Sequence, residues 1–180
     1  MSCILETERL LLRPPRATDI SYLVPLLNDF DVSKNLSPVP HPYTEDDACA
    51  FIVRMDYSLR TGSDYVFAIV LRPSCFIGVC GLHPRGEWEF GYWLGKPYWG
   101  KGYATEAAGR VVTFAFEELK AQKLKAGWYY DNPKSGRVLE KLGFKLTGEG
   151  ARNSLARGCK IDCHLVELDR ATYMTRKKAA

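Results

Sequence analysis

The chain has 180 residues, of which 46% are hydrophobic and 26% charged, and these values are ordinary for one soluble globular domain. The net charge of +4 is mild and the basic residues are scattered, apart from a cluster at 176–178, so we expect no nucleic-acid partner. No apolar run is long enough to cross a bilayer, and residues 1–12 carry charges where a signal peptide would be apolar, so we expect a cytoplasmic protein without a membrane partner.

In chain order, the first predicted elements are short and separated by prolines. An apolar run ahead of two prolines predicts a strand, and an apolar stripe at helical spacing follows Thr18. Thr44 and Asp47 form a capping-box pattern for a second helix, which should end at Gly62. We therefore expect a strand at 10–12, a helix from Thr18 to about Leu27, a loop over 33–43 and a helix from Thr44 to about Arg60.

From residue 65 onwards, strands dominate and then alternate with helices. Apolar residues from Ala108 to Leu119 recur at helical spacing, and a later helix has Asn132 as its N-cap, a proline at its first position and Gly143 at its end. We expect strands at 65–71, 76–82, 88–94, 125–130, 145–147 and 161–168, and the last helix at 133–142. This order predicts an α+β fold with one mixed sheet and no internal domain boundary.

Six cysteines and three histidines are dispersed along the chain and predict no metal site. The spacing of Cys159, Cys163 and His164 resembles half of a zinc site, but two further ligands at a recognisable distance are missing. We expect reduced structural thiols and hydrogen-bonded structural histidines instead. The remaining members of this set are Cys3, Cys49, Cys75, Cys80, His41 and His83.

Two glycines stand immediately before the helix that contains Ala108–Leu119. Gly100 and Gly102 would leave N–H groups exposed at the positive end of that helix, where a phosphate or pyrophosphate binds. Thr105 stands where a dinucleotide fingerprint requires a third glycine, and Lys101 is followed by glycine instead of the Ser or Thr of a P-loop. The residues alone leave two interpretations open: an anion site, or a turn that uses glycine only for its shape.

Four segments, in the right order, resemble the GCN5-related N-acetyltransferases (GNAT), in the RimJ/RimL-like branch of ribosomal-protein N-terminal acetyltransferases. The stretch EFGYWLGKPYWGKGYATEA resembles the acetyl-CoA-binding motif, with Trp99 where the general pattern has Gln or Arg. DNPKSGRVLEKLGFKLTGEG resembles the Asn-x-x-Ser stretch and Leu-Gly-Phe of that branch, and LETERLLLRPPRATDISYL and SPVPHPYTEDDACAFI are similar too. The resemblance covers residues 5–170 as an N-acetyltransferase domain and leaves 171–180 as a C-terminal tail.

The resemblance implies acetyl-CoA as co-substrate and a GNAT-like fold: a single mixed, mostly antiparallel sheet with splayed central parallel strands, flanked by about four helices. Backbone amides from Gly100 to Ala104 would cradle the pyrophosphate. The pantetheine arm would lie between strands 88–94 and 125–130 and pair with the main chain of Trp93 and Leu94. The implied coenzyme-binding residues are Trp93, Leu94, Trp99, Gly100, Lys101, Gly102, Tyr103, Ala104, Thr105, Asn132 and Ser135.

The reaction that the resemblance implies is direct attack of a primary amine on the acetyl thioester. Ser135 is the candidate donor to the departing thiolate, because Leu139 replaces the tyrosine that many relatives carry on this helix. The alternative is a serine that only caps its own helical turn. Glu89 is the candidate base, and the alternatives are a solvated strand residue or a chain of water molecules. A backbone N–H of strand 88–94 would stabilise the oxyanion.

The RimJ/RimL-like resemblance favours the α-amine of a protein or peptide N-terminus as the acceptor. An α-amine with a pKa of about 8 is partly neutral at physiological pH, whereas a lysine with a pKa of about 10.4 must have that pKa lowered. The loop over 33–43 and the two first helices should shape the acceptor pocket. A small-molecule amine acceptor and a catalytically silent acyl-CoA-binding module are the alternatives, and we expect a monomer or a homodimer.

Overall fold

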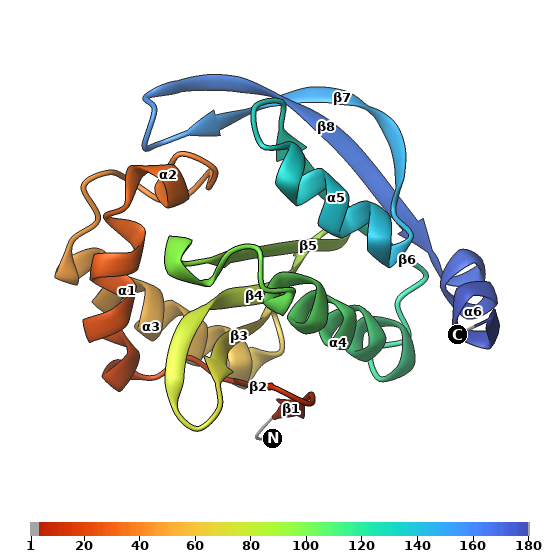
Figure 1. Ribbon diagram of the computed structural model, residues 1–180, viewed down its shortest axis with the longest axis horizontal. Coiled ribbons are helices and arrows are strands. Elements are labelled where there is room, and N and C mark those ends of the chain that lie inside the picture. The colour runs from red at the N-terminus through yellow and green to blue at the C-terminus, as the bar shows by residue number, and fades with distance from the viewer. Residues whose placement is uncertain (1–3, 180) are drawn as a thin grey trace.

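The computed structural model describes residues 4–179, and its centre is a single eight-stranded sheet (Figure 1). The strand order is β1-β2-β3-β4-β5-β6-β8-β7, and neighbouring strands are antiparallel except for β5 and β6, which are parallel. The strands are β1 (Leu5–Glu6), β2 (Leu10–Arg13), β3 (Tyr65–Leu71), β4 (Cys75–Arg85), β5 (Glu87–Leu94), β6 (Lys123–Tyr129), β7 (Lys145–Ser154) and β8 (Cys159–Asp169).

Helices cover both faces of the sheet and bury two apolar cores. The first three helices pack on one face around residues such as Leu23 and Phe76, and the next two pack on the other around Phe67 and Val111. None of the described helices is both long and apolar enough to span a membrane. The helices are α1 (Ile20–Leu27), α2 (Phe30–Ser33), α3 (Glu45–Thr61), α4 (Tyr103–Glu117), α5 (Pro133–Leu142) and α6 (Arg170–Ala179), with 3₁₀ turns at Ala17–Asp19 and Lys96–Tyr98.

The α+β class with one mixed sheet is confirmed, and several predicted element ends coincide with the observed ones. Asp47 N donates to Thr44 Oγ1 at 3.2 Å and Thr44 N donates to the Asp47 carboxylate at 2.8 Å, which forms the capping box at the start of α3. That helix ends where Gly62 adopts a φ of +68°. The helix expected at 133–142 coincides with α5, because its cap, its proline and its terminal glycine lie where the pattern requires them.

Other elements go beyond what the sequence predicts. β7 continues to Ser154 instead of ending at 147, because it pairs with β8 along its whole length although most of its residues are exposed. The expected C-terminal tail, 171–180, lies in helix α6 up to Ala179. Tyr173 anchors this helix: its ring stacks on Phe116 at a centroid distance of 4.7 Å, and its hydroxyl donates to Glu117 at 2.6 Å. The short β1 and α2 had no counterpart among the predicted elements.

The described cysteines are free thiols, and Cys3 lies outside the described residues. Cys163 is buried in β8 and Cys159 is exposed, while the ring of His164 packs against Trp128 at 4.9 Å. Within residues 4–179, no three metal-ligating side chains of the His, Cys, Asp and Glu types come together.

Candidate active site between two parallel strands

The parallel strands β5 and β6 are joined near their beginnings and then separate. In the described part of the chain, their register pairs are Trp88 with Leu124 and Glu89 with Lys125. After these pairs, β5 remains bonded to β4 and β6 remains bonded to β8. A gap therefore opens in the middle of the sheet, and one edge of β5 presents main-chain groups that no strand pairs.

The main chain of β5 that faces the gap belongs to alternate residues. Gly95 N donates to Ile77 O of β4 at 2.9 Å, which places Leu94 in a non-hydrogen-bonded pair with β4. The N–H and C=O groups of Leu94, and those of Tyr92 two residues earlier, therefore point into the gap, whereas those of Trp93 point to β4. The sequence predicts Trp93 and Leu94 at this edge, and the strand geometry puts Leu94 and Tyr92 there.

A loop with two left-handed glycines leads from β5 to α4. Gly100 and Gly102 have φ values of +74° and +82°, and Gly102 is the N-cap of the helix. Glu106 N donates to Gly102 O at 3.1 Å, so the amides of residues 103–105 (Tyr103, Ala104 and Thr105) come before the first helical hydrogen bond and point out of the helix end. A Cβ on Gly100 would meet no atom within 4 Å, so the space beside this loop is open. The loop has the geometry of an anion cradle.

The loop is fixed from the side by the N-terminal hairpin, which sequence reasoning missed. Arg9 Nη1 donates to Lys101 O at 3.1 Å, Arg9 Nε donates to Glu106 at 2.6 Å, and the guanidinium lies 4.6 Å from the Tyr103 ring centre. Thr7 Oγ1 also donates to Glu106 at 2.6 Å. Burial raises the pKa of Glu106, but these hydrogen bonds outweigh it and leave that pKa below its ordinary value. In the sequence, the nearness of Thr7 and Arg9, the two residues that bind Glu106, is the only sign of this contact.

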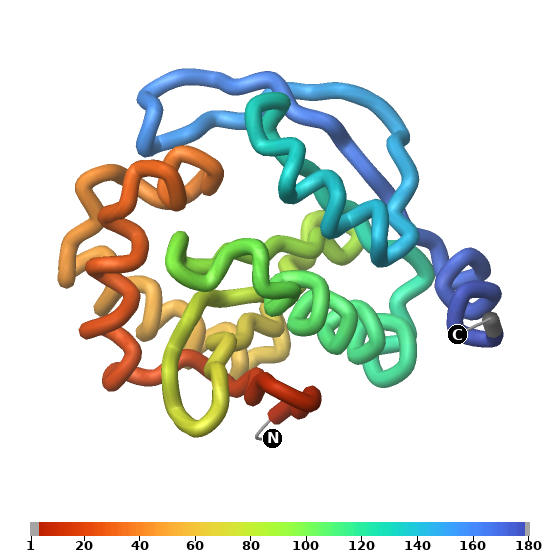
Figure 2. The backbone as a smooth tube through the Cα atoms, viewed as in Figure 1, coloured from red at the N-terminus to blue at the C-terminus, as the bar shows by residue number. Residues whose placement is uncertain are grey.

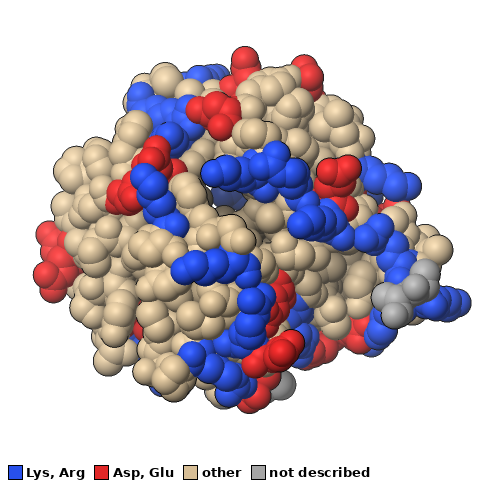
Figure 3. All heavy atoms as spheres, viewed as in Figure 1, with Lys and Arg blue, Asp and Glu red and all other residues tan. Residues whose placement is uncertain are grey.

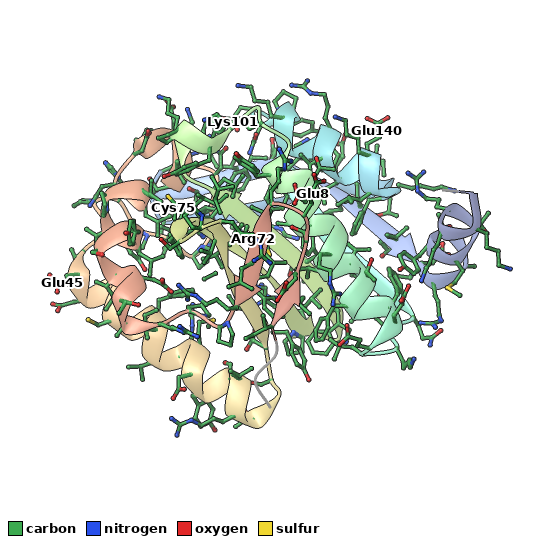
Figure 4. All side chains as sticks on the ribbon, turned by 60° about the horizontal axis from the view of Figure 1, so that its bottom comes forward. Glu8, Glu45, Arg72, Cys75, Lys101 and Glu140 are labelled. Carbon is green, nitrogen blue, oxygen red and sulfur yellow. The ribbon has the colours of Figure 1, made fainter. Side chains whose placement is uncertain are left out.

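The surface around the loop is hollowed and basic. Figure 3 shows a depression between α5 and the segment before α4, bordered by lysine and arginine side chains. Lys101 is exposed on this loop (Figure 4). Trp99 Nε1 donates to Leu94 O at 2.7 Å, which ties the loop to the end of β5, and Lys134 Nζ of α5 lies 5.8 Å from the Trp99 ring centre. An extended polyanion fits this side of the gap by charge.

Ser135 lies at the start of α5 with its hydroxyl directed towards β5. Asn132, the N-cap, accepts from Ser135 N at 3.4 Å, so the cap of this helix is the asparagine and not the serine side chain. Ser135 Oγ lies 3.0 Å from the hydroxyl of Tyr92. The helix packs closely on β6, since a Cβ on Gly136 would come within 2.7 Å of the Trp128 ring. Asn132 and Ser135 therefore border the gap on the same side as the glycine loop.

Tyr92 is the second residue that sequence reasoning missed. Its side chain follows Phe90 on the α4 and α5 side of the sheet, and the two rings stack at 5.8 Å. Burial raises the pKa of Tyr92 to about 12, and the hydrogen bond with Ser135 offsets this only in part. The alternation of the strand predicts the face on which Tyr92 lies, but its partner is 43 residues away in the sequence.

Glu89 lies on the opposite face of β5 and is held by two arginines. Arg152 of β7 pairs with one carboxylate oxygen, and Arg85 Nε lies 3.3 Å from the other. The Glu89 side chain is 15% exposed. A pocket of about 250 Å³ includes all three side chains in its lining, and Arg152 also lines a smaller neighbouring pocket with Ser37. Both oxygens of this carboxylate therefore have a cationic partner.

The β7–β8 hairpin closes this opposite face by reaching the loop after α2 (Figure 2). We call these contacts the latch: Ser37 Oγ donates to Asn153 O, and Arg157 Nε donates to Lys34 O at 2.8 Å. Arg157 also makes two hydrogen bonds to Asp131, at 2.7 and 3.1 Å. The latch joins the tip of the β7–β8 hairpin to the segment that contains Ser37, which lines the smaller pocket.

The sequence that contains the glycine loop and both strands of the gap matches a known family. The family model described as "Acetyltransferase (GNAT) domain" matches residues 9–145.

The chain belongs to the GNAT acetyltransferase family. It is 30% identical over 175 residues to "Uncharacterized N-acetyltransferase p20" of Bacillus licheniformis, which covers 94% of this chain and 97% of that protein. It is 40% identical over 152 residues to "Putative ribosomal N-acetyltransferase YdaF" of Bacillus subtilis, with coverage of 81% and 80%. The fold matches the spermidine N-acetyltransferase from Vibrio cholerae in complex with CoA and spermine, with a TM-score of 0.78, 19% identity and coverage of 93% and 99%.

This GNAT protein is therefore an N-acetyltransferase, and the GNAT fold uses acetyl-CoA. The residues of the site fit that co-substrate in two independent respects. The free amides at the start of α4 suit a pyrophosphate, and the open edge of β5 suits an extended amide-containing arm. The identity of the amine acceptor is a separate question, because the curated and solved relatives differ in the acceptors that their names give.

Proposed function

We propose that this GNAT enzyme transfers the acetyl group of acetyl-CoA to the α-amine of a protein or peptide N-terminus. One observation carries the proposal: the gap between β5 and β6 has the free amides of the glycine loop and Ser135 on one face, and carboxylates that are each paired with an arginine or a lysine on the other. Donor and acceptor would then approach the thioester carbon from opposite faces of the sheet. The resemblance to RimJ/RimL-like enzymes supports the same acceptor class.

On the donor face, the proposed contacts use mainly backbone groups. The amides of residues 100–105 bind the pyrophosphate, with Trp99 and Lys101 flanking them. The C=O of Tyr92 and the N–H of Leu94 pair with the pantetheine arm, since the Leu94 carbonyl is already bonded to Trp99. Asn132 lies beside the same arm, near Ser135.

The proposed chemistry is a direct transfer. The neutral amine nitrogen attacks the thioester carbon, and the Tyr92 N–H stabilises the oxyanion that forms. As the C–N bond forms and the C–S bond breaks, the sulfur takes the electron pair and Ser135 donates a hydrogen bond to it. The surplus proton on nitrogen leaves through water, and the pH profile of Glu89→Gln tests the other candidate, Glu89 as general base.

The charges on the acceptor face favour an amine with one positive charge at most. Each carboxylate that lines the 250 Å³ pocket has a cationic neighbour: Glu89 pairs with arginines, Lys125 lies 3.3 Å from Glu87, and Lys123 lies 2.9 Å from Glu167. A polyamine would need uncompensated acidic groups. An α-amine needs neither those groups nor a strong base. A small-molecule amine remains the alternative acceptor, and a silent acyl-CoA-binding module is the alternative from another class.

The test is thiol release from acetyl-CoA in the presence of a panel of acceptors. We expect peptides with free N-termini to react, with acetyl located on the α-amine by mass spectrometry, and N-terminally blocked peptides with internal lysines to react much more slowly. Ser135→Ala should lower kcat more than acetyl-CoA affinity, because a donor to the thiolate acts in the transition state. Acetylation of spermidine or lysine but of no α-amine would overturn the acceptor class, and binding without thiol release would favour the silent module.

A further inference from the structure

Tyr92 and Ser135 join a strand to a helix across the candidate active site. Tyr92 Oη lies 3.0 Å from Ser135 Oγ and 3.5 Å from the Ser135 carbonyl oxygen. The first distance is that of a hydrogen bond and the second is at its limit. No step of the chemistry proposed above uses the Tyr92 hydroxyl, although it is the nearest hydroxyl that the structure gives to Ser135 Oγ.

The number of hydrogens limits how this pair can act. Each hydroxyl carries one hydrogen and can accept others. If Ser135 donates to Tyr92, its only hydrogen is engaged and cannot reach a thiolate. If Tyr92 donates to Ser135, the serine hydrogen is free and the serine oxygen is held in place. The 3.0 Å contact allows either direction, and only the second arrangement leaves a serine hydrogen for the departing sulfur.

The surroundings of Tyr92 keep it a donor. Its ring stacks on Phe90 at 5.8 Å inside the apolar cluster between the sheet and α4. With its pKa raised to about 12 by burial, the hydroxyl stays protonated over any pH at which the enzyme is assayed. The charged side chains of the site do not compete for it: Glu89 and Arg152 pair with each other on the opposite face of β5.

We propose that Tyr92 is a positioning residue for Ser135: its hydroxyl donates to Ser135 Oγ and leaves the serine hydrogen directed at the departing sulfur. The proposal rests on the donor role proposed for Ser135. It involves hydrogen bonds only, so both hydroxyls keep their protons, and the thiolate takes its proton from water after the C–S bond has broken. Cooperation between the two hydrogen bonds strengthens the one to the sulfur.

The experiment is a double-mutant cycle with Tyr92→Phe, Ser135→Ala and the double variant. In the wild-type background, we expect Tyr92→Phe to lower kcat by about 3- to 10-fold, the loss of one hydrogen bond, with the KM for acetyl-CoA changed less than about twofold. In the Ser135→Ala background, the same substitution should leave kcat unchanged, because the residue through which it acts is gone. Calorimetry with coenzyme A checks that binding is intact in each variant.

Tyr173→Phe is the matched control. It also removes a partly buried tyrosine hydroxyl, which donates to Glu117 at 2.6 Å, but α6 is remote from the gap. Its kcat should equal that of the wild type. Equal loss of kcat on Tyr92→Phe in both backgrounds, or no loss in either, would overturn the positioning role of Tyr92. If Ser135→Ala alone leaves kcat unchanged, Ser135 is not the donor to the thiolate, and the positioning role of Tyr92 is wrong as well. If only the positioning role of Tyr92 is overturned, the donor role of Ser135 is unaffected.

Discussion

The two faces of the candidate active site are built in different ways. Most of the donor face is contiguous in the chain, because β5, the glycine loop and α4 follow one another from Glu87 to Glu117, and α5 adds Asn132 and Ser135. The acceptor face depends on the latch, whose hydrogen bonds join residues 116 and 123 positions apart. In the proposed site, the coenzyme is therefore bound mainly by backbone groups of one continuous segment, whereas the acceptor face is assembled by side-chain contacts between distant elements.

This difference matters because acetyl-CoA is the same co-substrate throughout the family, whereas the amine acceptor differs between relatives. Backbone amides at a helix start bind a pyrophosphate whatever the side chains are, provided that the glycines allow the turn. Ion pairs such as Arg152 with Glu89 can be exchanged without disturbing the sheet. Variation in the acceptor can therefore occur without loss of coenzyme binding. Substitutions on each face should change one substrate's binding and leave the other's intact.

The largest expected effect is on the donor face, with Gly102→Asp. A carboxylate there would crowd and repel the pyrophosphate, and the φ of +82° adds strain. We expect coenzyme A affinity to fall on the order of 100-fold by calorimetry. Gly86→Asp is the control, since Gly86 has a φ of +80° and open space around it but lies at the β4–β5 turn. If a folded Gly102→Asp variant binds coenzyme A with wild-type affinity, the coenzyme site does not lie at the glycine loop.

A smaller loss on the same face is expected for Arg9→Met. The substitution removes the contacts that hold Lys101 O and Glu106, but leaves the amides of the loop in place. We expect acetyl-CoA affinity to weaken by about 3- to 10-fold and acceptor KM to stay constant, because the pair is partly exposed and screened. Arg72→Met, which removes a comparably exposed arginine from its pair with Glu6, should have no such effect. A change in acceptor KM alone would show that the hairpin serves the other face.

On the acceptor face, Arg157→Met should loosen the latch. We expect acceptor KM to rise by about threefold in steady-state kinetics, with coenzyme A affinity unchanged. The hydrogen bonds from the Arg157 guanidinium lower the pKa of Asp131, so the ion pair is fully present at assay pH and is lost only as pH falls below the ordinary pKa of an aspartate. Arg60→Met, which breaks an exposed pair on α3, is the control. An effect confined to coenzyme affinity would contradict the assignment of the two faces.

The smallest effect is expected for Glu89→Gln in the pH profile. With wild-type enzyme, the rate should rise with pH and level off near the pKa of the α-amine, about 8. Because both oxygens of Glu89 are paired with arginines, we expect the variant to show the same profile, lowered uniformly by no more than about threefold. A selective loss of rate at low pH would identify Glu89 as the general base.

The same contrast explains what could be predicted from the sequence. The ends of α3 and α5, the glycine loop and the separation of two parallel strands follow from local patterns and family resemblance. The arginine pairing of Glu89, the latch and the Tyr92 contact with Ser135 do not, because each depends on how distant elements pack. The helix α6 was missed for a related reason: Tyr173 finds its partner on α4, and nothing in the polar terminal sequence indicates it.

The short junction between β5 and β6 divides the sheet into two hydrogen-bonded ladders. One consists of β1 to β5 and the other of β6, β8 and β7, and the register pairs Trp88–Leu124 and Glu89–Lys125 connect them. Rotation of one ladder about this hinge changes the width of the gap without breaking any other strand pair. A bound co-substrate that contacts both ladders restrains that rotation, so amide exchange at the junction should slow on binding. Opening of the gap for product release would in this way leave the strand pairs within each ladder intact.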